Sequence, residues 1–294
     1  MNKEEFKEIS YIKLFIDFIS KKNYSVKTLE SYLNDLRFFY NYIEKDLTIV
    51  KEIDVKTYIE YLNKKKMQAT SISRTISTFK TFYKFLYRNN IIDKKDYPLN
   101  KTVYPKKEKK LPKFLYYNEL LEIIEESKKD NDSIRDLLII EMLYATGVRI
   151  SELINIKVSD IDFNHRRIVV LGKGNKERVV YYGEYAQDAL NIYLDKHIKN
   201  KDGYLFVNHN GGQLTDRGVR YILNNIMRRL SIKTHVTPHV LRHTFATDML
   251  NNGCDIKVVQ EILGHSSLRS TEIYTHVTNE KLKKVYYECF KRGE

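Results

Sequence analysis

Residues 237–247, TPHVLRHTFAT, combine a strong helix start with two side chains that suit an anion site. Thr237 is a good N-cap and Pro238 fits a first helical turn, so the stretch predicts a helix beginning at Pro238. His239 and Arg242 then lie three residues apart on one face of this helix. The N–H groups and the dipole of a first turn favour a bound anion. A His-x-x-Arg pair is common on protein surfaces. Whether this pair belongs to a functional site must therefore be judged from the motifs around the helix.

Four short motifs on either side of this helix each contribute one candidate side chain. They are Arg149 in ATGVRISEL (145–153), Lys173 in GKGNKER (172–178), His265 in LGHSS (263–267) and Tyr274 in STEIYTH (270–276). Taken alone, each has an ordinary explanation, such as an exposed helix arginine, a turn lysine, a helix-capping histidine or one of 23 tyrosines. Their order, each in a suitable local context, indicates one common site.

The chain organisation around these motifs predicts two domains, because 294 residues with 42% hydrophobic content exceed one typical domain of about 100–200 residues. Residues 1–92 show apolar residues at helical spacing in four segments, which predicts a small helical bundle. Ser25 and Asp54 are the expected N-caps of its second and third helices. The periodicity fails over residues 93–115, where prolines and a lysine-rich run predict a semi-extended linker.

Residues 116–294 form the second predicted domain, in which helices surround one β-hairpin. The strands are expected at 166–171 and 178–182, joined by a tip that carries Lys173. The expected helices are 118–127, 133–145, 184–198, 215–230, 238–252, a short one from Asp255 to Gly264, one that holds Tyr274, and 279–290.

The charge of the chain favours a polyanionic partner. It has 51 Lys and Arg against 38 Asp and Glu, and residues 1–110 carry 24 basic and 14 acidic side chains. A basic surface attracts nucleic acid, although the same composition also serves solubility. On the helix over residues 70–84, short hydroxyl side chains stand beside cations and would allow a close approach to phosphates, or form an ordinary solvated face. The candidate DNA-binding residues are Lys27, Arg37, Arg74, Lys80 and Lys84.

Several function classes are disfavoured by the sequence. Neither an N-terminal signal peptide nor an apolar run of about 20 residues is present, and two cysteines, Cys254 and Cys289, suit a reducing cytoplasm. His239 and His243 have a spacing that can bind zinc, but Val240 stands where an HExxH motif has glutamate. GKGNK lacks the spacing of a phosphate-binding P-loop. We therefore expect neither a metal nor a nucleotide cofactor.

The five motifs together resemble those of the tyrosine recombinases, the phage integrase family, and the resemblance covers essentially the whole chain. The length and the phrases VYPKKEKKLPKFL and IYTHVTNEKLKKVYY are most similar to the Xer recombinases, which resolve chromosome dimers. The resemblance implies a mainly α fold. An N-terminal four-helix core-binding (SAM-like) domain would precede a mixed α+β catalytic domain with a small antiparallel sheet.

The resemblance also implies a reaction and a role for each candidate residue. Tyr274 would attack a scissile phosphodiester, forming a 3′-phosphotyrosyl link and releasing a 5′-hydroxyl, so that rejoining needs no ATP. Arg149 and Arg242 would hold the non-bridging oxygens, because guanidinium groups match phosphate geometry. His265 would add a donor, and His239 would be a second imidazole. Lys173 would protonate the leaving oxygen, and Glu152 would orient Arg149 or be an ordinary helix-face acid.

Partners follow from the same resemblance. The expected partner is a double-stranded recombination site bound by a tetramer of this chain or of a paralogue, and a DNA translocase is the candidate activator. The apolar stripe of the helix at 279–290 would dock in a neighbouring subunit or pack on its own domain. The alternatives are a mobile-element integrase, a non-catalytic DNA-binding protein and a topoisomerase-like nicking and closing enzyme.

Overall fold

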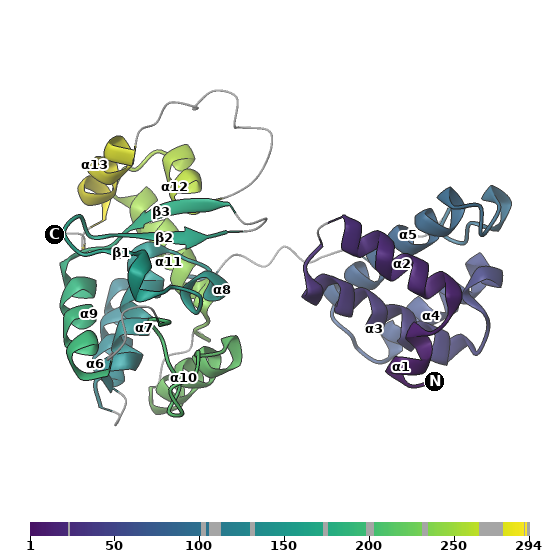
Figure 1. Ribbon diagram of the computed structural model, residues 1–294, viewed down its shortest axis with the longest axis horizontal. Helices are drawn as coiled ribbons and strands as arrows, with labels where there is room; N and C mark the ends of the chain where they lie inside the picture. The colour runs from purple at the N-terminus through teal and green to yellow at the C-terminus, as the bar shows by residue number, and fades with distance from the viewer. Residues whose placement is uncertain are drawn as a thin grey trace. The chain divides into compact units, whose positions relative to one another are not determined.

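The computed structural model divides the chain into two units, residues 1–110 and 111–294, each with its own hydrophobic core (Figure 1). It describes residues 1–22, 24–100, 104–105, 113–129, 133–172, 176–197, 203–230, 235–264, 279–290 and 292. Both units are mainly helical, and a small antiparallel sheet lies in the second, so the predicted fold class is confirmed. Within the described ranges, no helix combines the length and the hydrophobicity that crossing a membrane would require.

Unit 1 is a helical bundle whose four long helices correspond to the four predicted ones. Its elements are α1 (Lys3–Lys7), α2 (Ser10–Lys21), α3 (Val26–Ile43), the 3₁₀ turn η1 (Leu47–Ile49), α4 (Glu52–Lys64), α5 (Ala69–Arg88) and the 3₁₀ turn η2 (Lys94–Asp96). The apolar stripe of α5 is buried along its length, from Ile72 to Leu86. Burying such stripes against one another stabilises a bundle whose separate helices would be marginal in water.

The helix starts in unit 1 differ from the predictions at two points. Ser25 caps α3 as predicted, and its Oγ accepts a hydrogen bond from Thr28 N (3.2 Å). The prediction that Asp54 caps α4 was wrong, because the cap is Lys51 and Asp54 lies at the third helical position. There its carboxylate accepts a hydrogen bond from Lys51 N (2.9 Å), which explains why it resembles a cap in the sequence. The short α1 was not predicted.

The range predicted as a linker contributes residues to both cores. Leu99 is buried in the core of unit 1, and Leu115 is buried in the core of unit 2. Leu115 N also donates a hydrogen bond to Thr244 Oγ1 (2.9 Å).

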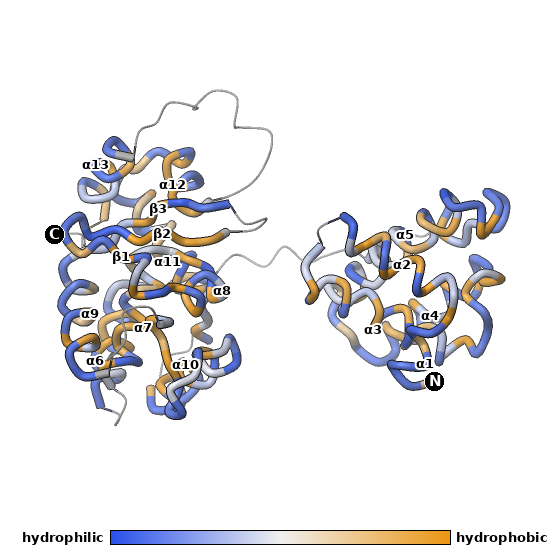
Figure 2. Tube along the Cα trace, viewed as in Figure 1, coloured by the Kyte–Doolittle hydropathy of each residue, from blue (hydrophilic) through white to orange (hydrophobic). Residues whose placement is uncertain are grey.

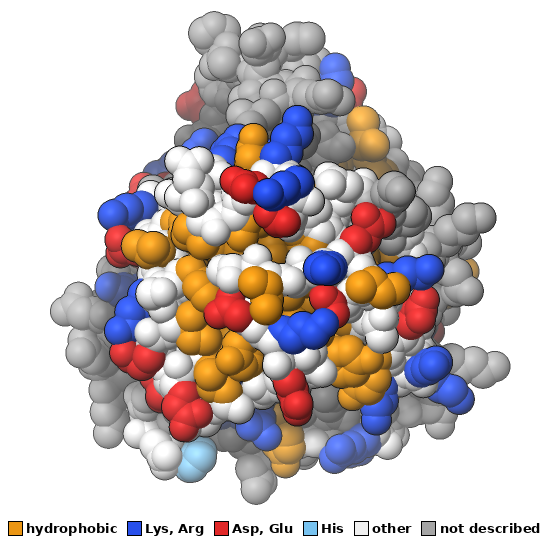
Figure 3. All heavy atoms as spheres, turned by 90° about the vertical axis from the view of Figure 1, so that its right-hand side faces the viewer, with side chains coloured by type: hydrophobic (Ala, Val, Ile, Leu, Met, Phe, Trp, Pro, Cys, Tyr) orange, Lys and Arg blue, Asp and Glu red, His pale blue; other side chains and the backbone are white. Residues whose placement is uncertain are grey.

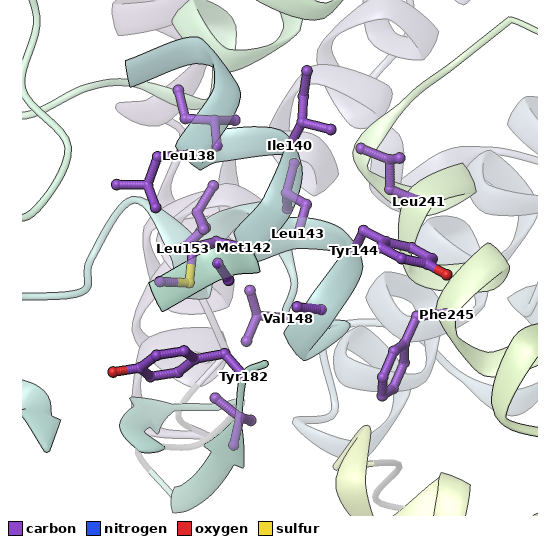
Figure 4. Close-up of a cluster of buried hydrophobic side chains, with 14 of the residues drawn as sticks. Leu138, Ile140, Met142, Leu143, Tyr144, Val148, Leu153, Tyr182, Leu241 and Phe245 are labelled. Atoms are coloured by element: carbon purple, nitrogen blue, oxygen red, sulfur yellow. The ribbon is translucent and has the colours of Figure 1, made fainter. Parts of the chain in front are cut away.

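Unit 2 is built around α7, which is hydrophobic on all sides. The helices of this unit are α6 (Tyr117–Ser127), α7 (Ser133–Thr146), α8 (Ile150–Leu153), η3 (Val158–Asp160), α9 (Glu184–His197), α10 (Asp216–Arg229), α11 (Pro238–Asn251), α12 (Ile256–Ile262) and α13 (Asn279–Cys289). Figure 2 shows α7 coloured mainly as hydrophobic. In Figure 4 its Tyr144 points toward Leu241 and Phe245 of α11, whereas Leu138 and Met142 lie on its other side. A helix that is apolar all round needs such cover on every face.

The sheet has three antiparallel strands in the order β1 (Ile161–Asp162), β2 (Arg167–Leu171) and β3 (Glu177–Tyr181). The predicted hairpin is β2 and β3, with Val170 opposite Arg178. The two-residue β1 is too short to leave a periodic pattern in the sequence. The hairpin brings Arg178 next to α8 and the end of α12, where the candidate site lies.

Candidate active site

Arginines from three separate elements meet at the C-terminal end of α12. Each donates a hydrogen bond to one of three successive carbonyl oxygens: Arg178 Nε to Ile262 (3.2 Å), Arg242 Nη2 to Leu263 (2.6 Å) and Arg149 Nη2 to Gly264 (3.2 Å). The last carbonyls of a helix have no partner within the helix and carry partial negative charge, so cations stabilise them. The chain therefore leaves α12 from a fixed position among three guanidinium groups.

Arg149 reaches this cluster from the start of α8, where it is the N-cap. One glycine, Gly147, allows the approach. Gly147 adopts a left-handed φ of 59°, and a Cβ at this position would lie only 2.6 Å from Phe245 Cδ1 and 2.7 Å from Leu263 Cδ2. Only glycine therefore allows α11 and the end of α12 to pack this closely on the turn that leads into Arg149. About a third of the Arg149 side chain is exposed, and its contacts with described residues use Nη1 and Nη2 once each.

Arg242 reaches the cluster from the first turns of α11, whose predicted start is confirmed because Thr237 caps it and Pro238 opens it. Its side chain is buried, with Nη1 donating to Gly147 O (2.5 Å). Burial, followed by the charge of Arg149, lowers the pKa of Arg242 to about 10. The guanidinium is still protonated near neutral pH, which makes it a fixed positive charge beneath the surface.

Glu152 is the acidic partner of the cluster, and its side chain is almost fully buried. It accepts hydrogen bonds from Arg149 N (2.7 Å) and Nη1 (2.8 Å), and from Arg178 Nη1 (2.9 Å) and Nη2 (2.8 Å). Burial alone would raise the pKa of Glu152, but the hydrogen bonds and charges of the two arginines outweigh it and lower the pKa to about 2. Of the two sequence interpretations of Glu152, orienting Arg149 fits these contacts and an exposed helix-face acid does not.

The remaining predicted catalytic residues are placed as follows. His239 is exposed in the first turn of α11, and no hydrogen bond between described residues joins it to Arg149 or Arg242. Lys173, His265 and Tyr274, with the helix predicted to hold Tyr274, lie outside the described residues. Gly264 directly precedes His265, Gly172 directly precedes Lys173, and both glycines lie at the cluster. Gly264 O accepts from Arg149, and a Cβ on Gly172 would lie 3.7 Å from Glu152 Oε1.

Arg178 is the residue that sequence reasoning missed. It belongs to the GKGNKER motif, but only its position on β3 was predicted, since nothing in the local sequence reveals a contact with Glu152, 26 residues away. One signal could have found it. Arg178 lies directly opposite Val170 in the hairpin, and residues opposite each other in an antiparallel pair have their side chains on the same face of the sheet. The apolar Val170 therefore indicates that Arg178 points to the same face.

The net charge of the cluster suits a phosphate. Three arginines and one ionised glutamate leave an excess of two positive charges in a partly buried site, where electrostatic attraction is stronger than in water. Such fixed donors stabilise negative charge that develops on phosphoryl oxygens without reorganising during the reaction. In the part of the chain that the structure describes, no three His, Cys, Asp or Glu side chains form a group that could hold a metal ion.

A second candidate surface is a groove of about 950 Å³ on unit 1, between α3, α4 and α5. Of the five predicted DNA-binding residues, Lys27 and Arg74 line it, and Arg74 Nη1 is held by Asp35 Oδ2 (2.5 Å) and Ser31 Oγ (2.6 Å). Lys84 is exposed on α5, Lys80 lies over the Tyr104 ring (4.3 Å) and Arg37 lies over Phe38 (5.2 Å). Figure 3 shows a face of the molecule on which basic, acidic and hydrophobic side chains are interspersed.

The C-terminal helix α13 packs on its own unit. Tyr286 and Phe290 are buried in the core, and Tyr286 Oη donates to Ala145 O (3.0 Å). Arg292, just beyond the helix, forms a buried ion pair with Glu141. Of the two sequence interpretations, the structure thus has the apolar stripe docked on its own domain.

Comparisons with known proteins agree with this architecture. The phage integrase family matches residues 113–281, and the N-terminal SAM-like domain of phage integrases matches residues 12–90. Tyrosine recombinase XerC of Listeria innocua is 42% identical over 294 residues, which cover 96% of this chain and 97% of that protein. Tyrosine recombinase XerC of Staphylococcus epidermidis is 44% identical over 284 residues, covering 93% of this chain and 94% of that protein.

Solved structures share the fold. The integrase of transposon Tn1549 in complex with transposon right end DNA has a TM-score of 0.73 at 20% identity, covering 94% of this chain and 98% of that chain. The XerH site-specific recombinase bound to difH substrate has a TM-score of 0.67 at 24% identity, covering 92% and 82%. With a family match over most of the second unit and relatives above 40% identity along nearly the whole chain, this protein belongs to the phage integrase family and is a tyrosine recombinase, an enzyme that cleaves and rejoins DNA.

Proposed function

We propose that this recombinase resolves chromosome dimers at one chromosomal site, acting in the cytoplasm, with Tyr274 as its nucleophile. The observation that carries the chemical part is the convergence of Arg149 and Arg242 on adjacent carbonyl groups at the end of α12. The chromosomal role draws its support from the XerC relatives, which match this chain almost end to end.

In the proposed reaction, the Tyr274 oxygen attacks the scissile phosphorus, and the bond from phosphorus to the 5′ oxygen breaks. The product is a 3′-phosphotyrosyl link and a free 5′-hydroxyl, and the reverse reaction with another 5′-hydroxyl rejoins the strand. Arg149 and Arg242 hold the non-bridging oxygens as negative charge develops on them. His265 donates a further hydrogen bond, His239 supports proton transfer at the phosphate or tyrosine, and Lys173 protonates the departing oxygen.

Binding of the duplex is assigned to both units, with Lys27, Arg37, Arg74, Lys80 and Lys84 contacting DNA from unit 1. Support comes from the exposed row on α5, where Arg74, Ser77 and Lys84 lie on one helix face. Arg74 is held by Asp35 and Ser31, which fixes the direction of its guanidinium before DNA arrives.

The active assembly is proposed to be a tetramer of this chain or of this chain with a paralogue, activated by a DNA translocase. In that assembly α13 would leave its own unit and occupy the same position on a neighbour. The exchange costs little net burial, because the residues that α13 contacts in its own unit are present on every copy.

The experiment is to map where the protein binds and cleaves its own genome, using covalent complexes recovered after rapid denaturation. A chromosomal role predicts one dominant site near the replication terminus, and loss of the protein should leave unresolved dimers. Covalent complexes only at the ends of a mobile element would contradict the chromosomal role and favour an integrase. Binding without any covalent complex would contradict the reaction itself.

A further inference from the structure

Arg178 joins three segments that each lead into a predicted catalytic residue. It lies on β3 with its side chain mostly buried, and it contacts both Glu152 and the end of α12. We propose that Arg178 is a positioning residue for strand cleavage, which fixes Arg149 through Glu152 and fixes the exit of α12 through Ile262. The inference rests on the proposed assignment of Arg149 to the scissile phosphate.

The first link runs through Glu152. The two Nη atoms of Arg178 donate to the two carboxylate oxygens in a bidentate pair (2.9 and 2.8 Å). The same two oxygens accept hydrogen bonds from the backbone N and from Nη1 of Arg149 (2.7 and 2.8 Å). The carboxylate is thus fixed on one side by Arg178 and fixes Arg149 on the other. Without Arg178, a buried carboxylate that loses half its donors would turn, and the Arg149 guanidinium would turn with it.

The second link runs to the end of α12. Arg178 Nε donates to Ile262 O (3.2 Å), and a Cβ on Gly264 would lie 2.9 Å from Arg178 Cδ. Gly264 therefore lies against the Arg178 side chain, in a left-handed conformation with φ of 65°. This contact sets the position from which the chain continues to His265.

The third link is the hairpin itself. Arg178 pairs with Val170 near the end of the ladder, and Gly172 N donates to Lys176 O (2.8 Å) at the base of the tip that carries Lys173. A Cβ on Gly172 would lie 3.5 Å from Arg178 Nη1. The side chain therefore anchors the base of the hairpin to α8.

Lysine cannot replace arginine in this role. Arg178 uses three N–H groups of its planar fork, two toward the carboxylate oxygens of Glu152 and one toward the carbonyl oxygen of Ile262. A lysine ammonium keeps the charge but is a single point that cannot bridge both carboxylate oxygens and a carbonyl in the same way. Loss of the bidentate geometry, with the charge retained, is what the experiment should isolate.

The test measures single-turnover cleavage of a nicked DNA substrate that traps the covalent intermediate, using the full chain. The variant Arg178→Lys should cleave about 10²-fold more slowly, since a displacement of about 1 Å at a catalytic group has that effect, with DNA affinity within about twofold of wild type. Arg229→Lys is the matched control, because Arg229 forms an ion pair with the buried Glu126 (2.7 Å) away from the cluster. This control should cleave like wild type.

A substrate with a neutral methylphosphonate at the scissile position separates positioning from general instability. Arg149 acts on the charged non-bridging oxygen, so a defect transmitted through Arg149 should shrink to a few-fold on the neutral linkage. An equal defect on both substrates would overturn the proposal, as would cleavage by Arg178→Lys at the wild-type rate. If wild type itself forms no covalent complex, or if Arg149→Lys cleaves normally, the proposed function fails instead.

If Arg178→Lys does not fold, the single variants Arg178→Gln and Glu152→Gln and their double variant provide a second test. Glu152→Gln breaks the same link from the other side while preserving side-chain shape. If Arg178 acts through Glu152, the double variant Arg178→Gln with Glu152→Gln should be no slower than the slower single variant. Rate losses that multiply would show two independent effects and would contradict the proposal.

Discussion

Glu152 shows at the scale of one residue how a buried charge is stabilised by geometry. Its carboxylate is surrounded by N–H donors from Arg149 and Arg178, and removing either arginine would leave an incompletely paired buried charge. The sequence predicts Arg149 and Arg242 because each stands in a recognisable motif next to a glycine or a helix start. It does not predict Arg178, since an arginine on a strand has no local feature that distinguishes an inward contact from a surface position.

The pKa of Glu152 leads to a pH prediction. Because the folded-state pKa of about 2 lies below the ordinary value of 4.5, the ionised carboxylate stabilises the fold above about pH 4.5, and this contribution is lost as pH falls toward 2. Between pH 6 and pH 3.5 the free energy of unfolding of wild type should fall by about 1 kcal/mol more than that of Glu152→Gln. Urea denaturation at the two pH values measures this difference.

The control for this measurement is Glu125→Gln, which removes an exposed glutamate paired with Lys128 (2.5 Å). Its pH dependence should match that of wild type, because an exposed ion pair contributes little. If Glu152→Gln and wild type lost the same stability between the two pH values, the carboxylate would not be stabilised in the way the contacts indicate.

Tyr286 and Tyr287 illustrate what structure adds to a choice among tyrosines. Tyr286 is fully buried, its hydroxyl donates to Ala145 O, and burial raises its pKa well above the ordinary value. Tyr287 donates to Tyr182 O (3.2 Å), and burial raises its pKa too. Neither phenol is available for attack in this conformation, so of the tyrosines near the C-terminus Tyr274 remains the candidate.

At the scale of elements, the predicted helices agree with the structure where capping residues and apolar periodicity coincide. Thr237 with Pro238 and Asp255 define the starts of α11 and α12, and both are confirmed. Prediction failed at Asp54, where a residue typical of caps lies inside the helix and not at its start. It also failed for α1 and β1, which are too short to show a periodic pattern of apolar residues. The packing of α13 on its own unit could not be chosen from the sequence, because the same apolar stripe suits either location.

The cap of α11 yields a prediction about stability. Thr237 Oγ1 accepts a hydrogen bond from Val240 N (3.2 Å), and this helix carries Arg242. Thr237→Ala should lower the free energy of unfolding by about 1 kcal/mol, because one N–H of the first turn loses its partner. Thr237→Ser keeps the hydroxyl and should retain most of the stability. Equal losses in the two variants, measured by thermal or urea unfolding, would mean that the cap does not stabilise α11.

At the scale of the whole molecule, the charge is distributed unequally between the two units. Residues 1–110 hold most of the excess positive charge, and residues 111–294 carry 27 basic and 24 acidic side chains. The sequence predicted a basic helical domain, a second domain that contains a β-hairpin, and one common site for the motifs, because composition and motif order are global properties. It could not predict how three arginines converge, since that depends on tertiary contacts between α8, β3, α11 and α12.

The charge distribution predicts a strong salt dependence of DNA binding. Each released phosphate contact contributes a slope of about 0.9 to the fall of log affinity with log salt concentration. Lys84→Gln should reduce this slope by about 1 if the exposed face of α5 contacts the backbone. Lys128→Gln, which removes a lysine paired with Glu125 on α6, should leave the slope unchanged. If log affinity falls with log salt concentration at the same slope in both variants, Lys84 does not contact the DNA backbone.

The most direct test of the central claim is to identify the amino acid that becomes attached to DNA. The protein is incubated in EDTA with a nicked duplex that carries its recombination site, and the covalent complex is digested and sequenced by mass spectrometry. We predict a nucleotide joined through its 3′ phosphate to Tyr274, and no adduct with Tyr274→Phe although that variant still binds DNA. Attachment to a different residue, or an adduct that forms only when Mg²⁺ is supplied, would contradict the account.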